Sequence, residues 1–336
     1  TRCPCPHVNI FTPFRYNMSM NITFVIPCHN EAPTLEDLVA GIFLHCPDEH
    51  DTTILIIDDG STDNTWDVIQ KLHKHDPRVN ALRFKPNQGK TEALRVAFKN
   101  IPAHCDTIIT MDGDLQDDPK EIPRMLEKLS EGHGLVCGWK QKRNDPIHKT
   151  LPSKVFNGTL SRLFKLPIHD MNSGYKAMKA TIARQLPLAG DLHRFLPVFT
   201  NTMGETVAEI PVQHHPRKFG VSKYGFSRFF TGARDAAAVW LLTRPGGERN
   251  PVTRVLKGFF RLSIGFIVGL LLGAWLIPFT MPVRITFVAI ALLLALTSIL
   301  GLGLMTFTHK LAQGILHPRD ESKNIAKSLG PIFNKH

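Results

Sequence analysis

Short apolar runs alternate with amphipathic helical patterns between residues 21 and 139. The runs cover residues 22–27, 53–58, 79–84, 107–111 and 134–138, and helical periodicity fills the intervals at about 34–45, 63–75, 89–100 and 119–131. Strands that alternate with helices predict an α/β domain with a mostly parallel sheet and helices on both of its faces. Such sheets bind ligands at the carboxyl ends of their strands, so the residues that follow each run are candidates for a site.

The fourth apolar run leads into an acidic turn, MDGDLQDDP, at residues 111–119. Asp112 and Asp114 are separated by one small residue, and Gln116 follows two positions later. Hard oxygen ligands of this kind suit Mg²⁺ or Mn²⁺, which keep several waters and bind substrate phosphates. A bare Asp-x-Asp is more often a solvated turn, and we interpret Asp118, before Pro119, as a helix cap. Because Asp112 and Asp114 end a strand before the cap begins, we expect them to hold a divalent ion.

Polar residues also follow the second run and open the third helical pattern. Asp58 and Asp59 are adjacent carboxylates at a strand end, which repel each other unless something binds them. A carboxylate there can accept from a base N–H or a ribose hydroxyl, whereas Asp63 is expected to cap the next helix. The sequence NQGK ends in Lys90 and opens a helix, so its N–H groups and Lys90 suit a phosphate. A solvated lysine is the simpler interpretation of Lys90 taken alone.

Basic residues after the fifth run are candidates for an acceptor site. WKQKR covers residues 139–143, and Lys149, Ser153 and Asn157 follow at a spacing that places them on one helix face. That face presents a cation, a hydroxyl and an amide to a phosphate, or it is a solvated basic helix.

Two further segments carry candidate residues for the same site. Asp170, in HDMNSGYK, either orients the acceptor or caps a helix. Arg217, Ser222 and Lys223 lie in the loop HPRKFGVSKYG, which is either a mobile basic loop that closes over a diphosphate or an exposed linker. His193 and Arg194, in GDLHRFLP, are additional candidates.

The last third of the chain contains two long apolar runs, at residues 262–279 and 285–307, separated only by TMPVR. They predict a transmembrane hairpin, and the cations on both flanks place the catalytic domain on the cytoplasmic side. Gly265, Gly269 and Gly273 recur every four residues, which permits close packing within the hairpin or between subunits of a homo-oligomer. Residues 226–261 are expected to be an amphipathic juxtamembrane segment, and 308–336 a cytoplasmic tail.

Composition agrees with a membrane-associated protein. The 336 residues are 43% hydrophobic, with a net charge of +11 and an isoelectric point near 9.5. A basic chain of this kind suits phosphorylated substrates or an anionic membrane, and the apolar tail favours the membrane over nucleic acid. The six cysteines form no disulfide pattern, so buried reduced thiols are expected. Residues 1–17 lack the apolar core of a secretory signal, and we treat residues 1–20 as an N-terminal extension.

Taken together, six motifs resemble the family-2 glycosyltransferases, which have the Rossmann-like GT-A fold. They are, in order, IPCHNE, IIDDGSTDNT, NQGK, MDGDLQDDP, HDMNSGYKAMK and HHPRKFGVSKYG. Within that family the chain looks like the polyprenyl-phosphate glycosyltransferases, which include dolichol-phosphate mannose synthases and bacterial enzymes acting on undecaprenyl phosphate. The resemblance extends from residue 21 to about residue 307, with a GT-A catalytic domain expected at residues 21–225.

The resemblance also assigns roles to the candidate residues. Together with the strand-end argument, it gives a nucleotide-sugar site of Pro27, His29, Glu31, Asp58, Asp59, Lys90, Asp112 and Gln116. The metal ligands are Asp112, Asp114 and Gln116, and the residues closest to catalysis are Asp112, Asp114, Asp170 and Arg217. The acceptor phosphate is expected at Lys140, Arg143, Lys149, Ser153, Ser222 and Lys223. His29 replaces a common tyrosine, and Lys140 and Lys149 replace frequent arginines, which loses the bidentate fork.

The expected activity is a metal-dependent, inverting transfer of a sugar from a UDP- or GDP-sugar to a polyprenyl phosphate. The lipid would be undecaprenyl phosphate in a bacterial inner membrane and dolichyl phosphate elsewhere. The alternatives are a glycosyltransferase with a non-lipid acceptor, a processive polysaccharide synthase, whose usual Gln-x-x-Arg-Trp signature is missing here, and a membrane-anchored scaffold that only binds nucleotide-sugar.

Overall fold

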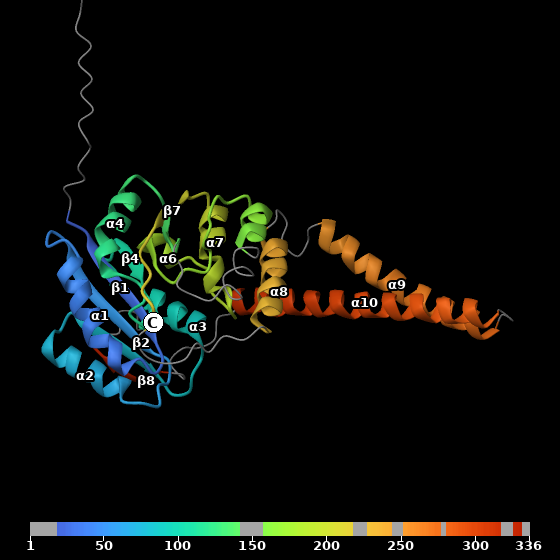
Figure 1. Ribbon diagram of the computed structural model, residues 1–336, viewed down its shortest axis with the longest axis horizontal. Coiled ribbons are helices and arrows are strands. Elements are labelled where there is room, and N and C mark those ends of the chain that lie inside the picture. The colour runs from blue at the N-terminus through green and yellow to red at the C-terminus, as the bar shows by residue number, and fades with distance from the viewer. Residues whose placement is uncertain are drawn as a thin grey trace, which may run out of the picture.

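The computed structural model describes residues 19–141, 157–217, 227–243, 251–276, 280–316 and 325–330. An eight-stranded sheet, in the order β7-β5-β6-β4-β1-β2-β3-β8, forms the centre of the molecule (Figure 1). The strands are β1 (Asn21–Cys28), β2 (Asp51–Asp58), β3 (Val79–Phe84), β4 (Thr107–Thr110), β5 (Leu135–Trp139), β6 (Lys176–Lys179), β7 (Val207–Pro211) and β8 (Ile325–Leu329). The first five correspond to the five apolar runs, so the expected α/β fold is confirmed.

Helices cover both faces of the sheet because its central strands are apolar on both sides. Phe24 of β1 packs in the same core cluster as α1 (Ala32–His45), α2 (Thr65–His75) and α4 (Ile122–Ser130). Its neighbour Val25 faces the opposite core cluster, which contains α3 (Lys90–Lys99), α6 (Ala180–Ala183), α7 (Leu196–Thr202) and α8 (Ser227–Leu242). Because successive side chains of a strand point to opposite faces of the sheet, one apolar run contributes to both core clusters.

Three strands that the sequence did not predict complete the sheet. β6 runs antiparallel between β4 and β5, and β7 pairs parallel to β5 at one edge. At the other edge β8, from the predicted tail, pairs antiparallel to β3. The β1–β2, β1–β4 and β2–β3 pairs are parallel, so the sheet is mostly parallel, as expected.

The C-terminal helices α9 (Pro251–Leu276) and α10 (Met281–Leu316) contact each other and project away from the sheet (Figure 1). The hydroxyls of Ser263 on α9 and Ser298 on α10 lie 2.6 Å apart. Within the described residues one segment is long and apolar enough to cross a membrane, Met281–Thr308, with a mean hydropathy of 2.6. The apolar part of α9, Leu262–Trp275, is shorter, and residues 277–279 of the first predicted span lie outside the described residues.

The end of α10 belongs to the sheet domain. Leu304 and Phe307 pack against the core that contains α3 and α8. The guanidinium of Arg234, on α8, lies 3.8 Å from the centre of the Phe307 ring. The second predicted apolar run, residues 285–307, therefore ends inside a protein contact, and α10 connects the projecting helices directly to the core of the sheet domain.

The described cysteines agree with the expected reduced thiols. Cys28, Cys46, Cys105 and Cys137 are buried and form no disulfide. Burial is the main cause that raises the pKa of each of these thiols, for Cys137 to about 12. They are therefore protonated packing groups rather than nucleophiles.

Candidate functional site

The candidate residues gather where the parallel strands β1, β2 and β4 end. Cys28 of β1 is in register with Asp58 of β2, so the residues that follow these strands start at the same level of the sheet. β4 lies on the other side of β1 and leads into the acidic turn. Pro27 is part of β1 and is buried, in register with Ile57. The sheet therefore brings the three predicted strand-end motifs to one edge.

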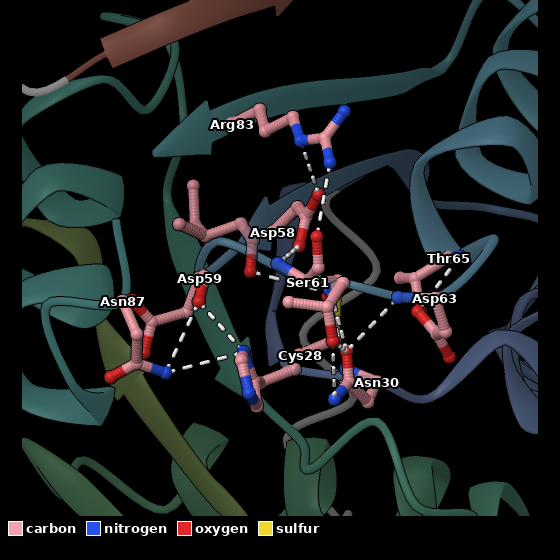
Figure 2. A network of polar contacts seen from close by, with 12 residues as sticks. Cys28, Asn30, Asp58, Asp59, Ser61, Asp63, Thr65, Arg83 and Asn87 are labelled. Carbon is pink, nitrogen blue, oxygen red and sulfur yellow. Dashed lines mark hydrogen bonds and ion pairs between the residues drawn. The ribbon is translucent and has the colours of Figure 1, made fainter. Parts of the chain in front are cut away.

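Asp58 and Asp59 are held by different partners, which offset the repulsion between the two carboxylates. The carboxylate of Asp58 is fully buried, 3.1 Å from Nε of Arg83, and it accepts from the amide of Ser61. Asp59 instead accepts from the amides of Gln88, at 2.6 Å, and Gly89, at 2.9 Å. Figure 2 shows Arg83 reaching Asp58 from β3, with Asp59 on the side of Asn87. Asp58 thus organises the turn, and Asp59 fixes the loop that carries Lys90.

The Asp58–Arg83 pair yields a stability prediction. Arg83→Met leaves a buried carboxylate without its cation, so we expect the free energy of unfolding to fall by about 3 kcal/mol. Denaturant unfolding of the detergent-solubilised protein measures this loss. The matched control is Arg78→Met, because Arg78 pairs with Asp76 on the surface and its side chain is 57% exposed. That change is expected to cost less than about 1 kcal/mol; equal losses in the two variants would contradict the account.

Contacts around this turn fix the position of the His29 ring and the start of α2. Nδ1 of His29 lies 2.8 Å from the backbone carbonyl oxygen of Asp59 and 3.2 Å from the side-chain nitrogen Nδ2 of Asn87. Asp63 accepts from the amide and the hydroxyl of Thr65, the first residue of α2, whereas the N-cap position itself is occupied by Asn64. The His29 ring is therefore fixed beside Asp59, on the predicted nucleotide side of the site.

Asp112 forms an ion pair with Lys90, the first residue of α3. Burial opposes ionisation of Asp112, but Lys90, with Lys140 and His193 further away, outweighs burial and lowers the pKa of Asp112 below its ordinary value. The backbone of Gly174 closely supports the carboxylate, since a Cβ at that position would lie 2.5 Å from Oδ2 of Asp112. The glycine of the NSGYK motif is therefore needed for the close approach of two chain segments.

Arg217 joins Asp114 to Glu31. Its guanidinium lies 2.6 Å from Oε1 of Glu31 and 3.4 Å from Oδ2 of Asp114. Burial is the main cause that raises the pKa of Asp114, followed by the charges of Asp112 and Asp117, and Arg217 acts in the opposite direction. Three residues predicted separately from IPCHNE, MDGDLQ and HHPRK therefore meet at one point.

The segment His214–Arg217 runs along the acidic turn. The amide of His215 donates to the carbonyl of Gln116, and the side-chain nitrogen of Gln116 donates to the carbonyl of His215 at 3.1 Å. These bonds bring Arg217 to Asp114. Asp118 accepts from the amide of Lys120, which confirms its predicted role as a cap.

Lys140 points into the protein rather than toward solvent. Its ammonium lies 2.8 Å from the fully buried carboxylate of Asp117, and only 11% of its side chain is exposed. Burial disfavours the charged form of Lys140, but Asp117 and Asp112 outweigh burial and raise its pKa. Lys140 thus neutralises part of the charge of the acidic turn, and its contact with an acceptor phosphate stays a prediction.

Asp170 lies in a loop that two buried groups organise. Its amide donates to the carboxylate of Glu209, which also accepts from the amide and the ring of His169. Lys176, at the start of β6, donates to the carbonyls of Met171 and Ser173. Burial lowers the pKa of Lys176. Sequence analysis named neither Glu209 nor Lys176, although a lysine after NSGY in an apolar context was a usable sign.

Five of the predicted acceptor residues lie outside the described part of the chain: Arg143, Lys149, Ser153, Ser222 and Lys223. Among the described residues, no group of three or more histidines, cysteines, aspartates and glutamates is arranged to hold a metal. The candidate metal position consists of two carboxylates, Asp112 and Asp114, with Gln116 beside them.

Comparisons with known proteins place this site in a wider context. A sequence profile described as glycosyl transferase family 2 matches residues 23–186. Dodecaprenyl-phosphate galacturonate synthase of Rhizobium johnstonii is 32% identical over 234 residues, which are 67% of this chain and 68% of the relative. Undecaprenyl-phosphate 4-deoxy-4-formamido-L-arabinose transferase of Klebsiella pneumoniae is 32% identical over 255 residues, 75% of each chain.

Solved structures share the same fold. The mannosyltransferase PcManGT from Pyrobaculum calidifontis, in complex with GDP-Man and Mn²⁺, matches with a TM-score of 0.50 and 16% identity. The match covers 90% of this chain and 88% of the other. At this level of identity the similarity concerns the fold, and it agrees with the predicted GT-A architecture.

Proposed function

This chain belongs to glycosyl transferase family 2, and we propose that it transfers a sugar from a nucleotide-diphosphate sugar to a polyprenyl phosphate at a membrane surface. One observation carries the proposal: Asp112 and Asp114 meet the cations Lys90 and Arg217 at the carboxyl edge of the sheet. Proteins commonly bind a nucleotide diphosphate through a divalent ion held by carboxylates and through cationic side chains that contact the phosphates. Asp112 and Asp114 can supply the carboxylates, and Lys90 and Arg217 the cations. The names of the relatives from Rhizobium and Klebsiella support the polyprenyl-phosphate acceptor.

The donor set fits a hard divalent cation. Asp112 and Asp114 supply carboxylate oxygens, and the backbone of Gly174 approaches Asp112 too closely for any larger residue. Mg²⁺ and Mn²⁺ are commonly held by one or two carboxylates, and waters and substrate phosphates complete the shell. Asp112, Asp114 and Gln116 would hold the ion, which would supply Lewis-acid stabilisation of charge on the diphosphate. The Mn²⁺ bound to PcManGT is in keeping with this proposal.

The chain's own cations then act on the leaving group. Lys90 and Arg217 are already at the acidic turn, where the diphosphate would lie between them. As the bond between the anomeric carbon and the diphosphate oxygen breaks, the electron pair leaves with the nucleoside diphosphate. Two fixed cations stabilise that growing negative charge more than they stabilise the bound donor, which accelerates the reaction.

The acceptor needs little activation. A phosphate monoester has a second pKa of about 6, so the polyprenyl phosphate is largely dianionic near pH 7. One of its oxygens attacks the anomeric carbon from the side opposite the diphosphate, which inverts the configuration. Asp170, which is buried, would orient this acceptor, and no strong general base is required.

The projecting helices would bring the site to the lipid. Many apolar side chains of α9 and α10 are exposed, among them Trp275 at 79% and Leu292 at 65%. Exposed apolar surface of this extent is typical of contact with lipid or protein. A Cβ at Gly265, Gly269 or Gly273 would meet nothing within 4 Å, so the described hairpin does not use these glycines for packing.

The membrane proposal predicts how the full-length chain fractionates. We expect it to stay in the membrane pellet after washing at high pH and to be released by detergent, because the apolar hairpin inserts into the bilayer. A peripheral protein in the same membranes is the control and should be released by the wash. Release of this chain by the wash alone would contradict insertion of the hairpin.

The lipid requirement can be tested directly. Purified protein in polyprenyl-phosphate-containing vesicles is incubated with Mn²⁺ and a panel of UDP- and GDP-sugars, and nucleoside diphosphate release is followed. We expect release from one donor only when both the lipid and the metal are present. Release that is independent of lipid would indicate another acceptor, and donor binding without release would indicate a nucleotide-sugar scaffold.

A further inference from the structure

The first turn of α3 carries Lys90, and no side chain caps the start of this helix. Gly89 precedes the helix with a φ of 89°, a conformation that glycine adopts readily. Because glycine is conformationally free, Gly89 does not itself hold the start of the helix in place. A helix start without a cap leaves its first N–H groups without intrahelical partners and frays easily. Lys90 therefore stays on Asp112 only if other groups hold this turn.

Contacts on both sides of Lys90 in the sequence hold the turn. Before it, the carboxylate of Asp59 accepts from the amides of Gln88 and Gly89. After it, the hydroxyl of Thr91 lies 2.8 Å from Nδ1 of His193. Lys90 is thus the one residue between two anchored positions, and its side chain extends from there to Asp112.

His193 is well placed to act as a fixed anchor. It lies on the short helix η2 (Leu192–Phe195), in which Leu192 and Phe195 are fully buried in the same core cluster as the apolar face of α3. Thr91 and His193 are themselves buried, at 2% and 7% exposure. A hydrogen bond shielded from water in this way is not replaced by solvent when one partner is removed.

We propose that His193 is a positioning residue that, through Thr91, fixes the first turn of α3 and thereby directs Lys90 to Asp112. The proposal builds on the proposed function in one respect, the role of Lys90 at the donor diphosphate. In this proposal His193 acts through the hydroxyl of Thr91, which is its hydrogen-bonding partner at 2.8 Å. The motif GDLHRFLP, which the transfer mechanism itself does not use, receives a function in this way.

Paired substitutions test the contact. Thr91→Val removes the hydroxyl and keeps the shape, and Thr91→Ser keeps the hydroxyl. His193→Leu removes the ring nitrogens, and His193→Asn keeps a hydrogen-bonding group near the position of Nδ1. We expect kcat to fall about 5- to 10-fold for Thr91→Val and His193→Leu, and by less than about 2-fold for the two conservative variants. The donor KM should change less than kcat, because Lys90 acts mainly on the departing diphosphate.

A double-mutant cycle separates positioning from general damage. In the Lys90→Gln background, Thr91→Val and His193→Leu are expected to add no further loss of kcat, since the lysine that they position is gone. Losses that multiply in the double variants would overturn the proposal, because His193 would then act by a route other than Lys90.

The same cycle on nucleotide binding needs no lipid acceptor. Calorimetry with UDP and with GDP, each in the presence of Mn²⁺, should give weaker binding for Thr91→Val than for Thr91→Ser, and no further weakening in the Lys90→Gln background. Equal affinities for the Val and Ser variants would overturn the positioning role. A wild-type protein that binds a nucleotide but transfers no sugar to lipid would instead reject the proposed function, and this binding cycle would still decide on His193.

Discussion

Asp112→Asn is expected to lower kcat for sugar transfer by about 10³-fold, with the fold unchanged. The substitution keeps the size of the side chain, which matters because the backbone of Gly174 lies directly against it. It removes the negative charge that pairs with Lys90 and that would hold the divalent ion. Steady-state rates of nucleoside diphosphate release, measured with saturating lipid and Mn²⁺, give the loss directly.

The matched control for Asp112 lies at the other end of the same strand. Asp106 precedes β4, and its Oδ2 accepts from the backbone amide of Asn21, far from the carboxyl edge of the sheet. Asp106→Asn keeps an oxygen that can accept this bond, so kcat should be unchanged. Comparable losses in the two variants, or metal-dependent activity in Asp112→Asn close to that of the wild type, would contradict the assignment of the acidic turn.

Arg217→Gln is expected to lower kcat by about 10²-fold, because one of two fixed cations at the diphosphate is lost. Arg217→Lys should recover only part of this loss. The guanidinium reaches Glu31 and Asp114 at the same time, and a lysine offers a single point charge in place of that planar fork. Rates are measured for both variants with the same donor and lipid. We expect kcat to be highest for the wild type, intermediate for Arg217→Lys and lowest for Arg217→Gln.

Arg124 provides the control for Arg217. It forms an ion pair with Glu121, whose side chain is 9% exposed, and 53% of the Arg124 side chain is exposed. Arg124→Gln should leave kcat unchanged, since this ion pair lies outside the acidic turn. If Arg217→Lys matched the wild type, a simple positive charge would suffice, and the bridging geometry would have no role in catalysis.

The order of apolar runs predicted the centre of the fold because buried parallel strands are continuously apolar. β6 and β8 were not predicted, because neither strand forms a continuous apolar run in the sequence. β6 begins with Lys176, whose ammonium turns back to the carbonyls of Met171 and Ser173, so a charge is tolerated inside the sheet. β8 is an exposed edge strand with only intermediate burial at Ile325 and Leu329, and such a strand needs no apolar pattern.

Motifs predicted which residues would gather, and tertiary contacts decided what each one does. Asp58 and Asp59 are indistinguishable in the sequence, yet the register of β2 with β3 brings Arg83 to Asp58 alone. Lys140 opens a basic segment in the sequence, and only the structure shows that its ammonium pairs with the buried carboxylate of Asp117. Partners that come from distant strands leave no trace in the local pattern, so these roles required the structure.

The most direct test of the proposed activity is the identity of the product. After reaction with the donor that supports release, the lipid fraction is extracted and analysed by mass spectrometry. A species heavier than the starting polyprenyl phosphate by one sugar residue is the predicted result. Unchanged lipid together with free sugar, or a lipid-independent polymer of many sugars, would contradict transfer to a polyprenyl phosphate.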